Sequence, residues 1–277
     1  MVFIMKIAVA GKGGTGKSYI AACLAKMSAM HIRKAGRGGQ VYAVDADPLG
    51  GLGNALGLSQ GTISEIRPIF DMREYIEEGE EDGSLYLSNP EAVNFDGQFH
   101  ASIGGVKYLR MAGIKHAGSG CYCHEYNFMQ VLLNSMILGE NDMLILDMCA
   151  GAEHLTRGAI KGVDMLLIVS EATRACIESA KALRSLGADL GIRHIYMAAN
   201  KIRNEKEELL IRASFKRGEL IGLVRMSEAV IDMAIGIGAA REQSGSAGVQ
   251  SGAAGVQTGA DISQLFFNIQ TIAISGL

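Results

Sequence analysis

The chain of 277 residues has no tryptophan and only three prolines, and aromatic residues make up 6% of it, which leaves little material for a base-stacking surface. The formal net charge is -3 and no basic block is present, so we expect no nucleic-acid partner. No apolar run reaches the ~18 residues of a membrane span, so we expect no membrane insertion. The N-terminus lacks the features of a secretory signal, which predicts a cytoplasmic protein.

Cysteine is also scarce. The five cysteines are Cys23, Cys121, Cys123, Cys149 and Cys176. An odd number in a chain of this length argues against a disulfide framework, so we expect core residues, metal ligands or redox groups. Cys23 and Cys176 fall in expected helices, where packing is the simplest role.

Short apolar runs alternate with longer helical patterns along the chain. We expect buried strands at 6–10, 41–44, 106–111, 143–146, 165–169, 194–199 and 220–224, and helices at 17–34, 173–186 and 205–215. Continuous apolar strands between helices are typical of a parallel sheet covered on both faces. The pattern therefore predicts an α/β fold, with a doubly wound, mostly parallel sheet, in a single domain over residues 1–277.

Two stretches are less regular. The acidic run at 77–82 is expected to be a solvated loop or a helix end. Near the C-terminus, residues 246–252 (SAGVQSG) are echoed by residues 253–259 (AAGVQTG). This composition predicts a flexible loop at about 243–260, followed by a helix from Asp261 to about residue 274.

The segment from Gly11 to Ser18 fits the phosphate-loop pattern G-x-x-x-x-G-K-[ST] between an expected strand and an expected helix. Its backbone N–H groups, from Gly11, Gly13, Gly14, Thr15 and Gly16, are expected to converge on phosphate oxygens. Lys17 supplies charge for the β- and γ-phosphates, and Ser18 offers a hydroxyl to Mg²⁺. The sequence thus predicts a P-loop NTPase that binds ATP or ADP with Mg²⁺.

Asp147 comes directly after the expected buried strand at 143–146, and Gly151 follows it four residues later. Ligands of open α/β sheets bind beyond the carboxyl ends of the strands. We expect Asp147 to hold a water on Mg²⁺ and the turn to sense the γ-phosphate. The alternative is an aspartate that only caps the next helix.

The second lysine of the loop, Lys12, resembles the deviant Walker A lysine of the MinD, ParA and nitrogenase-iron-protein class of ATPases. The resemblance implies a homodimer around two ATP molecules, in which Lys12 reaches the partner's nucleotide. It also implies that Asp47 orients the attacking water, that Asp45 lies in the Mg²⁺ shell, and that Asn200 contacts adenine. Alternatively, Lys12 is a solvent-exposed loop residue, one of the aspartates caps the helix after Pro48, and Asn200 is an ordinary turn residue.

The segment at about 118–125 contains Cys121 and Cys123. In an extended backbone both side chains fall on one face. One chain supplies two thiolates, and a two-fold dimer supplies the four that a soft metal usually takes. His116 and His124 are candidates to complete a metal shell, or they are surface histidines.

These motifs together resemble the CooC-type accessory ATPases for nickel insertion into carbon monoxide dehydrogenase. The resemblance runs over most of the chain and is carried by residues 12–18, 44–48, 120–123 and 147–158. Cys149 departs from the family pattern in the last of these segments. It implies a dimeric ATPase that binds Ni²⁺ or Zn²⁺ through Cys121 and Cys123 and delivers the metal to carbon monoxide dehydrogenase.

Two other functions fit parts of the sequence. An iron–sulfur ATPase of the nitrogenase-iron-protein type would draw cluster ligands from two segments, for which Cys121 and Cys149 are candidates. A positioning ATPase of the MinD or ParA type would need a membrane-binding tail or a basic surface. The C-terminal residues 269–277 contain no lysine or arginine and resemble neither.

Overall fold

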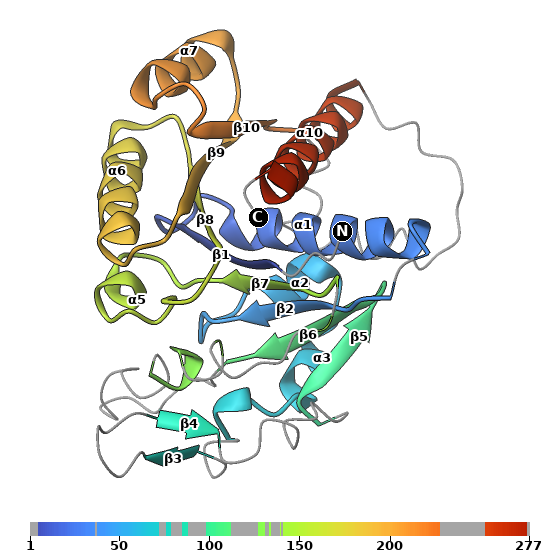
Figure 1. The fold of residues 1–277 in the computed structure, drawn as a ribbon. Coiled ribbons are helices and arrows are strands. Elements are labelled where there is room, and N and C mark those ends of the chain that lie inside the picture. Colours follow the sequence, from blue (N-terminus) through green and yellow to red (C-terminus); the bar gives the residue numbers. More distant parts are fainter. Residues whose placement is uncertain are drawn as a thin grey trace.

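The computed structural model describes residues 5–36, 38–71, 76–78, 85–87, 98–111, 127–130, 133, 139, 141–227 and 253–275. Its centre is an eight-stranded sheet in the order β10-β9-β8-β1-β7-β2-β6-β5 (Figure 1). The strands are β1 (Met5–Gly11), β2 (Val41–Asp45), β5 (His100–Ile103), β6 (Val106–Arg110), β7 (Met143–Asp147), β8 (Met165–Ser170), β9 (His194–Ile202) and β10 (Leu220–Arg225). All neighbours pair in parallel except β5 and β6.

Helices cover both faces of this sheet. They are α1 (Lys17–Lys34), α2 (Leu52–Leu56), α3 (Gln60–Glu65), α5 (Glu153–Thr156), α6 (Arg174–Asp189), α7 (Glu205–Ser214) and α10 (Ala253–Ser275). Figure 1 shows α1 and α10 over one face and α5 and α6 over the other. None of the helices in the described ranges is long and apolar enough to cross a membrane.

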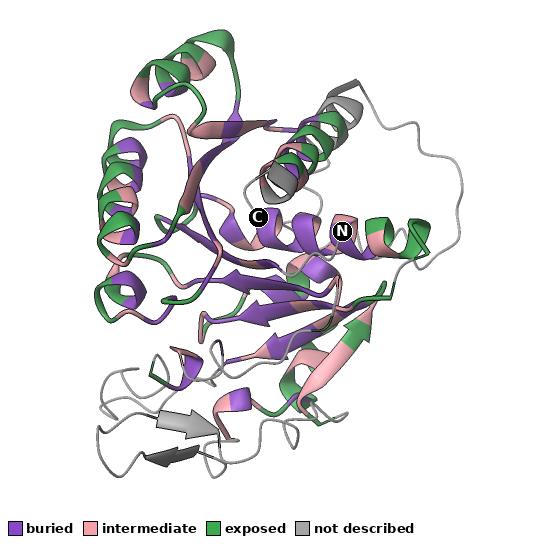
Figure 2. Ribbon diagram, viewed as in Figure 1, coloured by how far each residue is buried: buried purple, intermediate pink, exposed green. Residues whose placement is uncertain are grey.

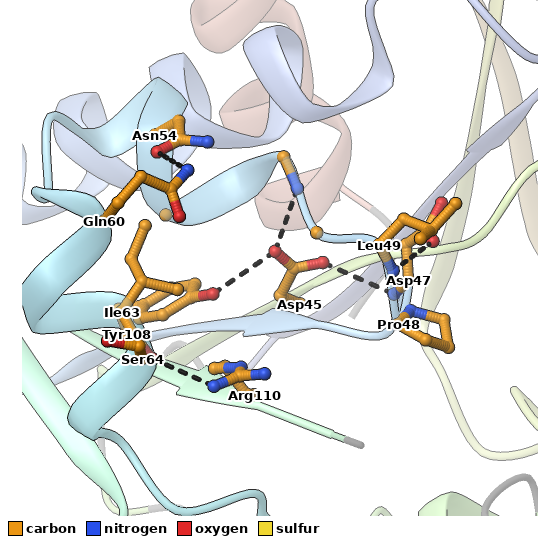
Figure 3. A pocket seen from close by; sticks show the side chains of 13 residues that line it. Asp45, Asp47, Pro48, Leu49, Asn54, Gln60, Ile63, Ser64, Tyr108 and Arg110 are labelled. Carbon is orange, nitrogen blue, oxygen red and sulfur yellow. Dashed lines mark hydrogen bonds between the residues drawn. The ribbon is translucent and has the colours of Figure 1, made fainter. Parts of the chain in front are cut away.

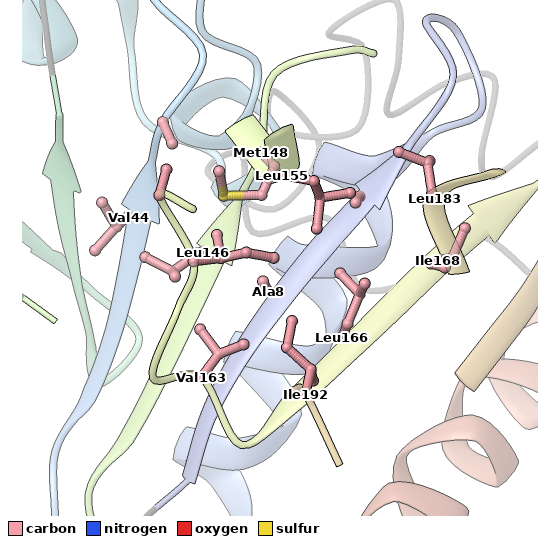
Figure 4. Close-up of a cluster of buried hydrophobic side chains, with 14 of the residues drawn as sticks. Ala8, Val44, Leu146, Met148, Leu155, Val163, Leu166, Ile168, Leu183 and Ile192 are labelled. Carbon is pink, nitrogen blue, oxygen red and sulfur yellow. The ribbon is translucent and has the colours of Figure 1, made fainter. Parts of the chain in front are cut away.

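The strand residues alternate between two apolar cores, one on each face of the sheet. In β1, Ile7 and Val9 belong to the core beneath α1, whereas Ala8 and Ala10 belong to the opposite core. The second core gathers side chains from neighbouring strands, such as Val44 and Leu146, around Ala8 (Figure 4). Burial on both faces explains the continuous apolar runs, and the central strands are buried along most of their length (Figure 2). The predicted doubly wound α/β fold is confirmed.

Three segments differ from the prediction. The edge strand β5 was not expected, because its residues are half-buried and form no clear apolar run. The acidic run was expected to be a loop or helix end, but Glu77 and Glu78 lie in β3 (Ile76–Glu78), which pairs with β4 (Leu85–Leu87). Helix α10 begins at Ala253 rather than Asp261, so the predicted loop at 243–260 is wrong for its final part. Alanine and glutamine favour a helix that packs on β10, and residues 243–252 lie outside the described ranges.

Candidate functional site

The carboxyl ends of the central strands bring the predicted phosphate loop and two aspartates to one edge of the sheet. Val9 on β1 is registered with Asp147 on β7, and Asp147 is registered with Asp45 on β2. The loop follows directly from β1 and leads into α1. This edge is where open α/β sheets bind ligands.

The loop between β1 and α1 has the backbone of an anion cradle. Gly16, at the start of α1, has φ 87, a left-handed conformation that favours glycine. A Cβ at Gly16 would lie 2.3 Å from Nδ2 of Asn200, so the position has no room for a side chain. Within the described residues no side chain caps the start of α1, so the N–H groups of its first turn favour an anion.

The two lysines of the loop are placed differently. Lys17 is only 8% exposed, and its Nζ donates a long hydrogen bond of 3.5 Å to the Lys12 carbonyl oxygen. The Thr15 hydroxyl donates to the same oxygen at 2.9 Å. The Lys12 side chain is exposed. Lys17 thus lies inside the loop, whereas Lys12 faces outward, which leaves it available to a second molecule.

Asp147 is the most unusual group at this edge. It is 1% exposed, and within the described part of the chain neither carboxylate oxygen has a hydrogen-bond partner of normal geometry. Burial, followed by the charge of Asp45, raises the pKa of Asp147 to about 7, although the Ser18 hydroxyl and Lys17 act to lower it. A buried carboxylate without donors, beside a hydroxyl, is the oxygen-rich donor set that Mg²⁺ prefers. Ser18 and Asp147 are the residues that fit this cation.

Asp45 has the opposite environment. Its Oδ1 accepts from the Asp47 N–H at 3.3 Å, and its Oδ2 accepts from the N–H groups of Gly51 and Leu52 at 3.1 Å each and from the Tyr108 hydroxyl at 3.3 Å (Figure 3). Burial raises the pKa of Asp45 to about 6, and the backbone donors oppose this rise. The carboxylate therefore fixes the turn that follows β2, and its place in the Mg²⁺ shell stays a prediction.

Asp47 sits on the turn that Asp45 fixes. It is partly exposed, and its Oδ1 accepts from the Leu49 N–H at 3.0 Å. The turn borders a cavity of about 340 Å³ with Tyr108 and Arg110 in its lining (Figure 3). The same turn lies against the phosphate loop, since a Cβ at Gly51 would be 2.9 Å from the Ser18 Oγ. Its water-orienting role stays a prediction.

Two neighbouring residues of β9 contact the phosphate loop. Asn200 is 1% exposed, and its Nδ2 donates to the Thr15 carbonyl oxygen at 2.8 Å. Lys201 donates from Nζ to the Gly14 carbonyl oxygen at 2.5 Å and pairs with Oε1 of Glu171 at 2.7 Å. The predicted strand ended before both residues, but β9 continues through them. Sequence reasoning did not foresee the contacts of Lys201 with Gly14 and Glu171, and the adenine contact of Asn200 stays a prediction.

The segment after β7 contains a buried histidine, His154. His154 on α5 is fully buried, and its Nδ1 lies 4.0 Å from the Cys149 Sγ. Burial, and then the charge of Lys17, lowers the pKa of His154 to about 4, so the ring is neutral at physiological pH. Cys149 is partly exposed, and Cys176 is buried on α6, as expected of a packing residue.

The predicted metal segment at about 118–125 lies outside the described residues, with Cys121, Cys123, His116 and His124. Among the residues that are described, no group of three or more histidine, cysteine or acidic side chains is arranged to hold a metal ion. The Ni²⁺ or Zn²⁺ site therefore stays a prediction.

Comparison with known proteins gives relatives over most of the chain, although no protein-family model matches it. The chain is 35% identical over 230 residues to the carbon monoxide dehydrogenase accessory protein CooC of Rhodospirillum rubrum, covering 82% of this chain and 85% of that protein. It is 36% identical over 234 residues to an uncharacterized ATP-binding protein of Methanocaldococcus jannaschii, covering 82% of this chain and 87% of that one. The fold matches the septum site-determining protein MinD of Pyrococcus horikoshii, complexed with Mg-ADP, with a TM-score of 0.60, 15% identity, and coverage of 98% of this chain and 97% of that chain.

Proposed function

Because the chain belongs to the family of the carbon monoxide dehydrogenase accessory protein CooC and is an ATPase, we propose that it serves as an ATP-dependent metallochaperone. In this function it takes up nickel or zinc and delivers the metal to a carbon monoxide dehydrogenase in the cytoplasm. The observation that carries the proposal is the 35% identity to CooC over 85% of that protein.

The ATPase part of the proposal rests on the phosphate loop, on Asp147 at the end of β7 and on Asp47 in the turn after β2. Lys17 provides the positive charge that stabilises the β- and γ-phosphates, and α1 directs its N-terminal N–H groups at the same oxygens. Mg²⁺, when bound through Ser18 and Asp147, neutralises charge on the phosphates. Asp47 orients a water for attack on the γ-phosphorus, the bond to the bridging oxygen breaks, and ADP and phosphate leave.

The metal part rests on the number of thiolates. Cys121 and Cys123 give two per chain, and a homodimer closed through Lys12 gives four, which is the number a soft metal takes. The exposed Lys12 beside the buried Lys17 supports this arrangement, because only an outward side chain can reach a partner's nucleotide. ATP binding then closes the dimer and shapes the cargo site, and hydrolysis reopens it.

The test is metal uptake by the anaerobic protein, measured by elemental analysis with Mg-ATP, together with activation of metal-free carbon monoxide dehydrogenase. Cys121→Ala/Cys123→Ala should lose both uptake and activation but keep nucleotide binding. Cys176→Ala is the matched control, because this buried cysteine lies on α6 and is outside the predicted metal segment in sequence. Unchanged metal content in the double variant contradicts the proposal.

The same preparation tests the iron–sulfur alternative. A brown chromophore that is lost in Cys121→Ala and in Cys149→Ala would indicate a cluster shared by two segments. A colourless protein with nickel or zinc supports the metallochaperone. The likeness to MinD shows the shared fold and does not by itself favour a positioning function.

A further inference from the structure

We propose that Asn200 and Lys201 are positioning residues of the ATPase, which set the orientation of two consecutive peptide groups of the phosphate loop. Asn200 Nδ2 donates to the Thr15 carbonyl oxygen at 2.8 Å, and Lys201 Nζ donates to the Gly14 carbonyl oxygen at 2.5 Å. These side chains come from β9, so they hold the loop from outside. The inference concerns the ATPase site and does not depend on the metal cargo.

The planar peptide bond explains why these contacts matter. In a trans peptide the C=O and the next N–H point in opposite directions. Asn200 fixes the Thr15 carbonyl toward β9 and thereby turns the Gly16 N–H the other way, at the N-terminal end of α1. A phosphate loop works through N–H groups that converge on the anion, so its carbonyls must be held outside.

The Lys201 contact acts on the preceding peptide group. With the Gly14 carbonyl held by Lys201, the Thr15 N–H points to the Lys12 carbonyl oxygen at 3.4 Å, which is a long and weak hydrogen bond. A phosphate oxygen can replace such an acceptor at little cost. Glu171, the residue after β8, pairs with the Lys201 ammonium at 2.7 Å.

The backbone of Lys201 gives an independent indication of a constrained role. Lys201 has φ 58, in the left-handed region that lysine disfavours. The other non-glycine residue with positive φ in the described ranges is Asn141, a residue type that tolerates this conformation. A strained residue persists where its surroundings hold it, and such strain is concentrated at functional sites. Here the contacts with Gly14 and Glu171 hold it.

The contact between Asn200 and the loop is also sterically tight. A Cβ at Gly16 would lie 2.3 Å from the Asn200 Nδ2, and Asn200 is 1% exposed. Asn200 thus fills the space directly behind the loop. In this position it acts on every nucleotide through the loop backbone, whereas a residue that reads adenine would act only on ligands with that base.

The experiment measures dissociation constants of Mg-ADP and of magnesium tripolyphosphate, which has no base, for Asn200→Ala, Lys201→Ala and Lys201→Gly. Each lost charge-assisted or buried hydrogen bond should weaken the binding of both ligands by about tenfold or more. The KM for ATP should rise more than kcat falls. Lys201→Gly also relieves the positive φ, so it keeps the fold while losing the Nζ contacts.

The matched control is Lys181→Ala, which removes an exposed lysine that pairs with Glu178 at 3.1 Å on α6. It should leave both dissociation constants unchanged. If the Asn200 and Lys201 variants weaken ADP but not tripolyphosphate, these residues read the base, and the proposal is wrong. If a folded Lys201→Gly protein binds both ligands as the parent does, the proposal is also wrong.

Discussion

Asp45 and Asp147 are registered with one another on adjacent parallel strands, yet within the described residues the Asp45 carboxylate accepts four hydrogen bonds and the Asp147 carboxylate accepts none of normal geometry. The Asp45 carboxylate accepts hydrogen bonds from the backbone of the turn after β2. Asp147 is buried and lacks partners within the described residues, so it is the carboxylate that a cation would satisfy. The two aspartates therefore have different environments, although each is the last residue of a buried strand.

Replacement of Asp147 by Asn should change how the stability of the nucleotide-free protein depends on pH. The pKa of Asp147 is about 7 in the folded state, above the ~4 of an unfolded chain, so folding favours the protonated form. The parent protein should therefore lose stability relative to Asp147→Asn as pH rises from about 4 to about 7. Urea unfolding at pH 5 and pH 8 measures the difference.

Mg-ADP provides the control for this prediction. A cation beside Asp147 favours the ionised carboxylate, so bound Mg-ADP should reduce the pH dependence in the parent but not in Asp147→Asn. Parallel pH profiles for the two nucleotide-free proteins would show that Asp147 does not titrate as a buried, unsatisfied group.

The two lysines of the loop should have separable effects. Lys17→Ala removes a buried charge beside the phosphate site, so the dissociation constant for ATP should rise by about tenfold or more. Lys12→Ala removes an exposed side chain, so nucleotide binding should stay within about threefold while ATP hydrolysis and ATP-dependent dimer formation are lost. Calorimetry and sedimentation with Mg-ATP distinguish these outcomes. Equal loss of affinity in both variants would contradict the outward placement of Lys12.

Gly16→Ala should destabilise the protein more than Gly14→Ala. Both glycines have positive φ, which costs about 1 kcal/mol for alanine. Only the Gly16 Cβ meets another atom, Nδ2 of Asn200 at 2.3 Å, whereas the Gly14 Cβ meets nothing within 4 Å. We expect an additional loss of about 1–3 kcal/mol in the free energy of unfolding for Gly16→Ala. Equal losses in urea unfolding would mean that Asn200 moves away freely.

Much of the fold follows from local patterns. The continuous apolar runs predicted every parallel strand of the sheet, because a strand buried on both faces has few polar residues. The edge strand β5 was not predicted, because an antiparallel strand with half-buried residues has no continuous apolar run. The start of α10 at Ala253 was also missed, because its glycine-containing sequence suggested a loop while its packing against β10 cannot be read locally.

Those residues of the candidate site that belong to a local motif, or that lie at the end of a predicted strand, could be predicted from the sequence. The glycines and Lys17 follow from the loop motif, and Asp45 and Asp147 follow from their places at strand ends. One of the four donors to Asp45 is the Tyr108 hydroxyl, which lies 63 residues away in sequence. The contact of Lys201 with Gly14 spans 187 residues. Such long-range pairings arise from packing and leave no spacing to recognise.

The most direct test of the metallochaperone is the number of metal ions per chain. Native mass spectrometry of the anaerobic protein, with Mg²⁺ and a non-hydrolysable ATP analogue, measures mass and metal content together. Two thiolates from each chain predict one nickel or zinc ion per dimer, absent from Cys121→Ala/Cys123→Ala. A monomer that binds the metal, or one ion per chain in a dimer, would contradict a cargo site shared between two chains.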